Sequence, residues 1–124
     1  MKIQQLLEAV DDVVLTKMAT TINRDVSTHN QYTDRSCFGK VAHYLKKHRN
    51  PEWYIMLFGA GVNREVTHCC LYDATGAAII DTFGHGGSPQ NVDGNVVYVD
   101  ADGRHHPLLL SITVGNFCSQ YGIK

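Results

Sequence analysis

The sequence predicts an α+β fold in a single domain that spans residues 1–124. Apolar residues recur at three- and four-residue steps in the first part of the chain, which is the period of a helix packed on one side. Short apolar runs separated by turn residues fill the remainder, which is typical of strands. With 124 residues, of which 44% are hydrophobic, the chain is long enough to bury a core of its own.

An amphipathic helix is expected over most of residues 1–20. Its apolar stripe is assigned to the core and comprises Ile3, Leu6, Leu7, Val10, Val13, Val14 and Met18. Residues 23–35 are polar and predict a loop, which ends at Ser36 as a candidate helix cap.

A second helix is expected to begin at Cys37. Four of its residues would face the core: Phe38, Val41, Ala42 and Leu45. Basic residues at 46–49 favour the last turn of a helix, and Asn50-Pro51 stops it.

The rest of the chain predicts strands. The apolar run 53–58 is followed by a hairpin of 65–72 and 77–82 around the turn Asp73-Ala74-Thr75-Gly76. Glycines make residues 84–95 a predicted mobile loop. Residues 96–99 and 108–114 then form a second hairpin around Asp102-Gly103.

The register of the first hairpin decides which residue faces His68. If Tyr72 pairs with Ala77, His68 stands opposite Asp81, and the carboxylate can accept the imidazole N–H. A three-residue loop with a glycine bulge slides the pairing by one and brings Thr82 opposite His68 instead. We predict the first register, because it gives His68 a charged partner.

The charge balance and the absence of a signal-peptide or membrane-span pattern exclude two classes of expected partner, nucleic acid and membranes. The chain has 11 Lys+Arg and 12 Asp+Glu and no extended basic block, so nucleic acid is not an expected partner. The first residues are too polar for a signal peptide, and no run approaches membrane-spanning length, so we expect a cytoplasmic protein without a membrane partner. The four cysteines, Cys37, Cys69, Cys70 and Cys118, are then expected to be free thiols. The sequence sets no oligomeric state.

Cys37 is the candidate nucleophile. A cysteine at a helix N-terminus lies beside unpaired backbone donors and the positive end of the helix dipole, and both favour the thiolate. Downstream, His68 lies in an apolar segment, and Asp81 opens Asp81-Thr82-Phe83-Gly84. A thiol, an imidazole and a carboxylate in this order are the parts of a nucleophile, its base and the group that orients the base.

These residues resemble the papain-like cysteine peptidases. Gln31, six positions before Cys37, together with Ser36-Cys37-Phe38, His68 and Asp81-Thr82-Phe83-Gly84 is similar to that family's order of Gln, Cys, His and Asn motifs. The resemblance implies that Gln31 supplies an oxyanion donor, Cys37 attacks, His68 acts as base and acid, Asp81 orients His68, and Phe83 covers the His–Asp contact. It also implies a papain-like core in which the helix that carries Cys37 packs on a small antiparallel sheet.

The sequence departs from the peptidase pattern at several points. Asp81 stands where the peptidases have Asn, as in transglutaminase-like enzymes, and Phe38 replaces Trp. The chain is short, which favours a minimal core and a narrow substrate. We therefore predict a thiol hydrolase or acyl transferase that acts through a thioester on an amide or isopeptide of a protein or peptide-like substrate. Peptidase, deamidase and transferase activities remain alternatives, because one thioester serves all three.

Two other classes compete with this prediction. A non-catalytic binding or regulatory module would keep the fold without turnover. A structural zinc site would draw on His68, Cys69, Cys70, His85, His105, His106 and Cys118, but Cys-x-x-Cys and His-x-x-x-His spacings are absent. We therefore expect no metal and no cofactor.

Overall fold

The computed structural model describes residues 3–23, 37–60, 65–81 and 87–123, with the backbone alone at 3–12, 60 and 65–67. Its elements in chain order are α1 (Ile3–Asn23), α2 (Cys37–Lys47), β1 (Tyr54–Ala60), β2 (Glu65–Tyr72), β3 (Ala78–Ile80), β4 (Ser88–Val92), β5 (Asn95–Val99), β6 (His105–Thr113) and α3 (Val114–Tyr121). The expected α+β class is confirmed.

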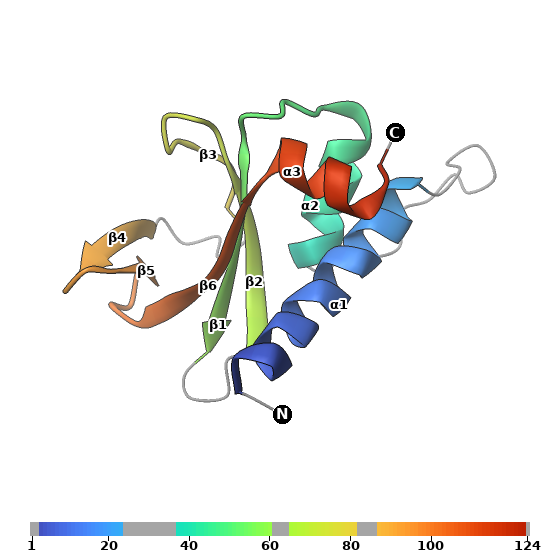
Figure 1. Cartoon of the computed structure of the whole chain (residues 1–124). Helices are drawn as coiled ribbons and strands as arrows, with labels where there is room; N and C mark the ends of the chain where they lie inside the picture. The colour runs from blue at the N-terminus through green and yellow to red at the C-terminus, as the bar shows by residue number, and fades with distance from the viewer. Residues whose placement is uncertain (1–2, 24–36, 61–64, 82–86, 124) are drawn as a thin grey trace.

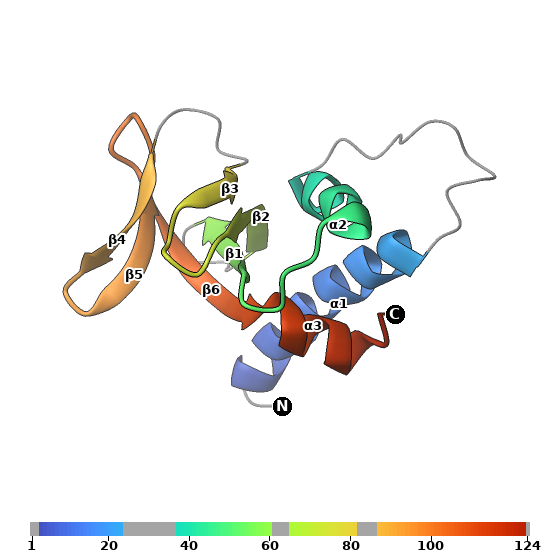
Figure 2. The ribbon, with the colours of Figure 1, turned by 90° about the horizontal axis from the view of Figure 1, so that it is seen from above.

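The described strands form one antiparallel sheet in the order β3-β2-β1-β6-β5-β4. The described helices lie on one side of it, and β4 and β5 curl away from them on the other (Figures 1 and 2). No helix in the described part of the chain has both the length and the apolar character needed to cross a bilayer.

The helix face of the sheet carries the larger core. Alternate residues of β1 and β2, among them Leu57, Cys69 and Leu71, point to this face, because successive strand residues alternate sides. Helix residues that pack against them are Leu15, Met18, Ala19 and Ile22 of α1, Val41, Ala42 and Leu45 of α2, and Val114 and Phe117 of α3. The inward residues expected for the second helix are thus buried, except Phe38, which is half-buried.

The opposite face is concave. Its core consists of Phe58 on β1, Cys70 and Tyr72 on β2, and Tyr98 on β5. Strand β5 lies two places from β1 in the sheet order. Tyr98 therefore reaches Phe58 only because the sheet curls and brings β5 over β1, with ring centroids 5.6 Å apart.

The structure corrects three expectations. Residues 84–95 were predicted as a loop, but Ser88–Val92 forms strand β4, which pairs with β5 around Asp93 and Gly94. Val13 is 51% exposed, because it lies about 140° around the helix from buried Met18. Helix α3 was not expected; Thr113 caps its start by accepting from the Asn116 N–H at 3.1 Å, and Gly122 ends it with φ +68°.

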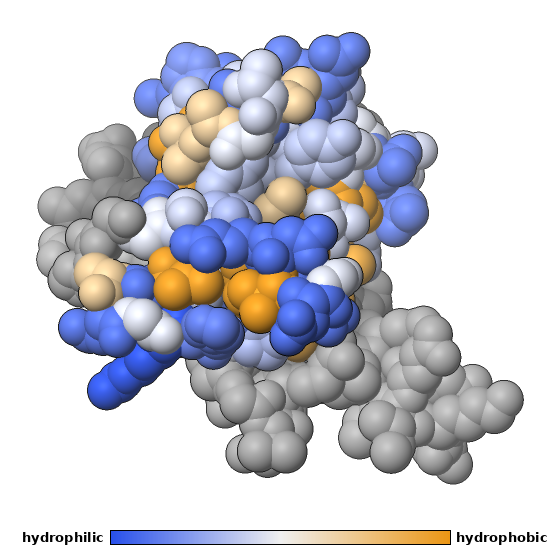
Figure 3. Space-filling view, turned by 90° about the vertical axis from the view of Figure 1, so that its left-hand side faces the viewer, coloured by the Kyte–Doolittle hydropathy of each residue, from blue (hydrophilic) through white to orange (hydrophobic). Residues whose placement is uncertain are grey.

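The side of the molecule on which β4 and β5 lie carries apolar side chains between hydrophilic ones (Figure 3). Val96 of β5 is 38% exposed. Pro89 lies in β4, which is an edge strand of the sheet, where a residue without an N–H is tolerated.

Candidate active site

Cys37 begins α2, as the sequence predicts, and packs against the helix-face core that contains Cys69. Burial raises the pKa of the Cys37 thiol, whereas backbone hydrogen bonds, that of Cys69 first, and the Lys40 charge lower it. The helix start lowers this pKa as expected, but the expected net lowering is wrong, because burial of the thiolate costs more free energy than the helix start provides. Cys37 is therefore a neutral thiol at neutral pH.

His68 lies on β2 and points to the concave face. Its cross-strand partner on β1 is Phe58, which belongs to the concave-face core. The imidazole makes an edge contact with His106 of β6, with ring centroids 5.7 Å apart and an angle of 83° between the planes.

Burial lowers the pKa of His68, and the neighbouring His106 lowers it further. The charges of Asp81 and Asp100 oppose this shift. The charge of Asp81 thus acts on His68, but its effect does not outweigh burial. The imidazole is neutral at neutral pH.

The predicted hairpin register is wrong. Asp73 N–H donates to the Ala77 carbonyl at 2.9 Å, and Gly76 has φ +89°, which is the three-residue loop with a glycine bulge. Tyr72 therefore pairs with Ala78, and a further irregularity pairs Leu71 with Ile80. Neither Asp81 nor Thr82 is a described strand partner of His68, since this pairing ends at Ile80.

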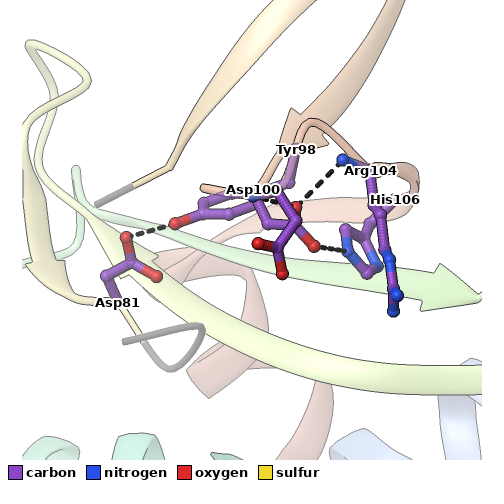
Figure 4. A network of polar contacts seen from close by, with 6 residues as sticks. Asp81, Tyr98, Asp100, Arg104 and His106 are labelled. Atoms are coloured by element: carbon purple, nitrogen blue, oxygen red, sulfur yellow. Dashed lines mark hydrogen bonds and ion pairs between the residues drawn. The ribbon is translucent and has the colours of Figure 1, made fainter. Parts of the chain in front are cut away.

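Asp81 follows β3 directly and is half-buried. Its Oδ2 accepts a hydrogen bond of 2.6 Å from the Tyr98 hydroxyl on β5 (Figure 4). β3 and β5 are four places apart in the sheet order, so the curl of the sheet makes this contact possible.

A second histidine and carboxylate pair adjoins His68. Asp100 Oδ2 lies 2.9 Å from His106 Nε2, while Asp100 Oδ1 accepts from the backbone N–H groups of Asp102 and Arg104 (Figure 4). We name His68, Asp81, Tyr98, Asp100 and His106 together the histidine–aspartate cluster. Its members come from β2, β5, β6 and the chain just after β3 and β5.

The structure brings His68 and Asp81 into one cluster but leaves Cys37 on the helix face of the sheet. Cys37 nevertheless lies beside the backbone of Cys69, the next residue after His68. Gln31, Ser36, Thr82, Phe83, Gly84 and His85 lie outside the described residues, so their predicted roles stay predictions.

Sequence reasoning missed Tyr98, Asp100 and His106. A signal was present, because the expected hairpin around Asp102-Gly103 has the same Asp-x-x-Gly pattern as the first turn. Asp100 N–H donates to the Arg104 carbonyl at 3.0 Å, and continuing this pairing sets Tyr98 opposite His106. No local pattern of this kind indicated the contact between Tyr98 and Asp81, which lie four strands apart in the sheet.

The cluster is chemically suited to acid and base work. It offers two imidazoles, two carboxylates and a hydroxyl within one curled face. Among the described residues, no group of three or more His, Cys, Asp or Glu side chains is arranged to hold a metal ion. All four cysteines are free thiols in this structure.

Comparisons of this chain with protein-family models, with curated proteins and with solved structures found no match.

Proposed function

We propose that this protein is a thiol hydrolase or acyl transferase in which Cys37 is the nucleophile, His68 the base and acid, and Asp81 the group that supports His68. One observation carries the proposal: the Cys37 sulfur is next to the backbone of Cys69, and the adjacent residue, His68, interacts electrostatically with Asp81. Cys37 and the His68–Asp81 pair therefore lie near neighbouring positions of β2, on opposite faces of the sheet, and residues of these three types cooperate in thiol catalysis.

The chemistry starts from neutral partners. Because burial keeps Cys37 a thiol and His68 an uncharged imidazole, the base removes the thiol proton as the sulfur attacks the substrate carbonyl. The imidazolium then gives that proton to the leaving amine, and a thioester remains on Cys37. Water or a second amine gives a proton to His68 as it attacks the thioester, and the C–S bond breaks to release the product. The imidazolium then gives that proton to the Cys37 sulfur, which restores the thiol and the neutral imidazole.

The proposed mechanism requires His68 and Cys37 to come into contact. The His68 ring lies on the concave face and Cys37 on the helix face, so contact between the imidazole and the sulfur requires a change in the backbone conformation of β2 at His68. The substrate class, a protein or peptide-like amide or isopeptide, belongs to the proposal.

A non-catalytic binding module is the second candidate. The observation that favours it is the separation of Cys37 and His68 by the sheet, together with the raised pKa of the Cys37 thiol. Such a module has no use for a reactive thiol.

Alkylation separates the two candidates. Iodoacetamide labelling of each cysteine is followed by mass spectrometry across a pH series, with Cys118, another half-buried helical cysteine, as the internal control. The enzyme proposal predicts that Cys37 labels fastest and that His68→Ala slows it by about tenfold. His48→Ala, at an exposed histidine, is the matched control and leaves the rate unchanged.

Equal labelling of Cys37 and Cys118, or equal rates in wild type and His68→Ala, would contradict the enzyme proposal and favour the binding module. If Cys37 is the more reactive thiol, screening of amide, ester and isopeptide donors for a thioester adduct on Cys37 then identifies the substrate class.

A further inference from the structure

Within the histidine–aspartate cluster, the Tyr98 hydroxyl donates a hydrogen bond of 2.6 Å to Asp81 Oδ2 (Figure 4). The ring is fully buried and makes edge contacts with Phe58, at 5.6 Å between centroids, and with His106, at 6.4 Å. Because the Tyr98 ring is packed against these two neighbours, its hydroxyl has little freedom to turn away from Asp81.

We propose that Tyr98 is the positioning residue of the His68 and Asp81 pair. By binding one carboxylate oxygen, it fixes the place of the Asp81 charge, which acts on His68 through space. The effect of Tyr98 on catalysis rests on the proposed function. The hydrogen bond from Tyr98 to Asp81, and the effect of the Asp81 charge on His68, do not depend on it.

Asp81 is a carboxylate at the end of a short strand. β3 comprises only Ala78–Ile80, and its described pairing to β2 ends at Ile80, one residue before Asp81. A hydrogen bond from a neutral donor to a carboxylate is short and about twice as strong as one between neutral groups. The hydrogen bond from Tyr98 therefore fixes the position of Asp81 beyond the end of the described β2–β3 ladder.

Tyr98 is suited to be a permanent donor. Burial raises the pKa of its hydroxyl, and the hydrogen bond and charge of Asp81 raise it further, so the proton stays on Tyr98. The other groups facing this centre are Cys70 and Tyr72 from β2, Asp100 after β5, and His106 from β6.

The first test needs no substrate. The titration of the His68 imidazole is followed by NMR in wild type, Tyr98→Phe, Asp81→Asn and the double variant. Because the Asp81 charge raises the pKa of His68, Asp81→Asn lowers it. The inference predicts that Tyr98→Phe also lowers it and adds nothing further when Asp81 is already Asn, which is a double-mutant cycle with coupling.

Tyr72→Phe is the matched control. Tyr72 is buried on the same face, and its hydroxyl makes no hydrogen bond to Asp81. This variant leaves the His68 titration as in wild type. The inference is overturned if Tyr98→Phe leaves the pKa of His68 unchanged, or lowers it equally in the Asp81→Asn background, since the second result indicates general loosening of the core.

The second test uses turnover or, before a substrate is known, the rate of Cys37 alkylation. Tyr98→Phe is expected to lower kcat, or this rate, by about tenfold with little change in KM, and Asp81→Asn is expected to remove the Tyr98 effect. If the titration cycle shows coupling while Cys37 has no enhanced reactivity, the thiol proposal fails and the positioning role of Tyr98 stands. If neither couples, the inference itself fails.

Discussion

Phe58 of β1 and His68 of β2 are direct cross-strand partners, and the ladder between the two strands shifts register immediately after Phe58. Cross-strand partners share a face, so this pairing commits His68 to the concave face, where Tyr98 and His106 lie. A shift of one residue would have turned the imidazole toward the helices and Cys37. The register of one strand pair therefore decides which groups surround the candidate base.

The pH dependence of stability tests the burial of His68. The pKa of His68 in the folded chain lies below its ordinary value of 6.5, so the unfolded chain binds this proton more tightly. Stability from this residue is complete above 6.5 and declines as pH falls from 6.5 toward the folded pKa. The urea midpoint of unfolding should fall as pH is lowered from about 7.5 to about 5.5, and we expect this fall to be smaller in His68→Gln than in the wild type. His48→Gln, at an exposed site, leaves that loss unchanged; equal losses in all three proteins would contradict the prediction.

Two turns of the same construction test the contact between Asp100 and His106. Asp73 and Asp100 each accept two backbone N–H groups of their own turn through Oδ1, but Asp100 alone of the two also contacts a histidine, through Oδ2. An asparagine keeps the turn acceptor and removes the negative charge. At about pH 6, where both carboxylates are ionised, Asp100→Asn should lower the urea midpoint more than Asp73→Asn.

The decline of stability at acid pH tests the same contact between Asp100 and His106. Hydrogen bonding from His106 lowers the pKa of Asp100, so stability from this carboxylate is present above its unfolded pKa and is lost as pH falls through the folded value. Asp100→Asn should flatten the decline of the urea midpoint below about pH 4. An unchanged decline, or equal midpoints for the two variants at about pH 6, would show that the histidine contact contributes nothing.

Gly87 and Gly94 are two glycines needed for different reasons. A Cβ on Gly87 would overlap the Val99 carbonyl oxygen and come within 2.9 Å of Asp100 Cα, both of them backbone atoms. A Cβ on Gly94 would meet nothing within 4 Å, but the residue has φ +84°. We expect Gly94→Ala to cost about 1 kcal/mol of unfolding free energy and Gly87→Ala about 3 kcal/mol, measured by urea unfolding. Equal losses of unfolding free energy in the two variants would contradict the prediction, because they would mean that the backbone around Gly87 accommodates a Cβ.

Local chemistry explains which elements were predictable. The second helix begins at Cys37 and the second strand runs from 65 to 72 as expected, because helical spacing and continuous β-branched or apolar residues act within a few residues. Strand β4 was missed because Ser88–Val92 has no alternation of its own and owes its conformation to hydrogen bonds with β5. The Asp93-Gly94 pair, with both φ angles positive, was the local signal for that hairpin.

Candidate site residues follow the same division. Cys37 at a helix start and His68 in a strand lie where residue type and local pattern predicted, whereas Asp81 follows β3 instead of lying within it and acts on His68 without the predicted cross-strand pairing. The charge state was not predictable, because the pKa of Cys37 and of His68 depends first on burial, which packing between distant segments decides.

By itself the sequence determined the class of fold, the first two helices and most of the strands. Tertiary structure alone decided the face on which His68 lies, the bond between Asp81 and Tyr98, and the place of Cys37 behind the sheet. The physical reason is that helical period and turn chemistry act over a few neighbouring residues. The register of a ladder, in contrast, depends on the neighbouring strand, and the contact between Asp81 and Tyr98 depends on the curl of the whole sheet, which joins residues four strands apart.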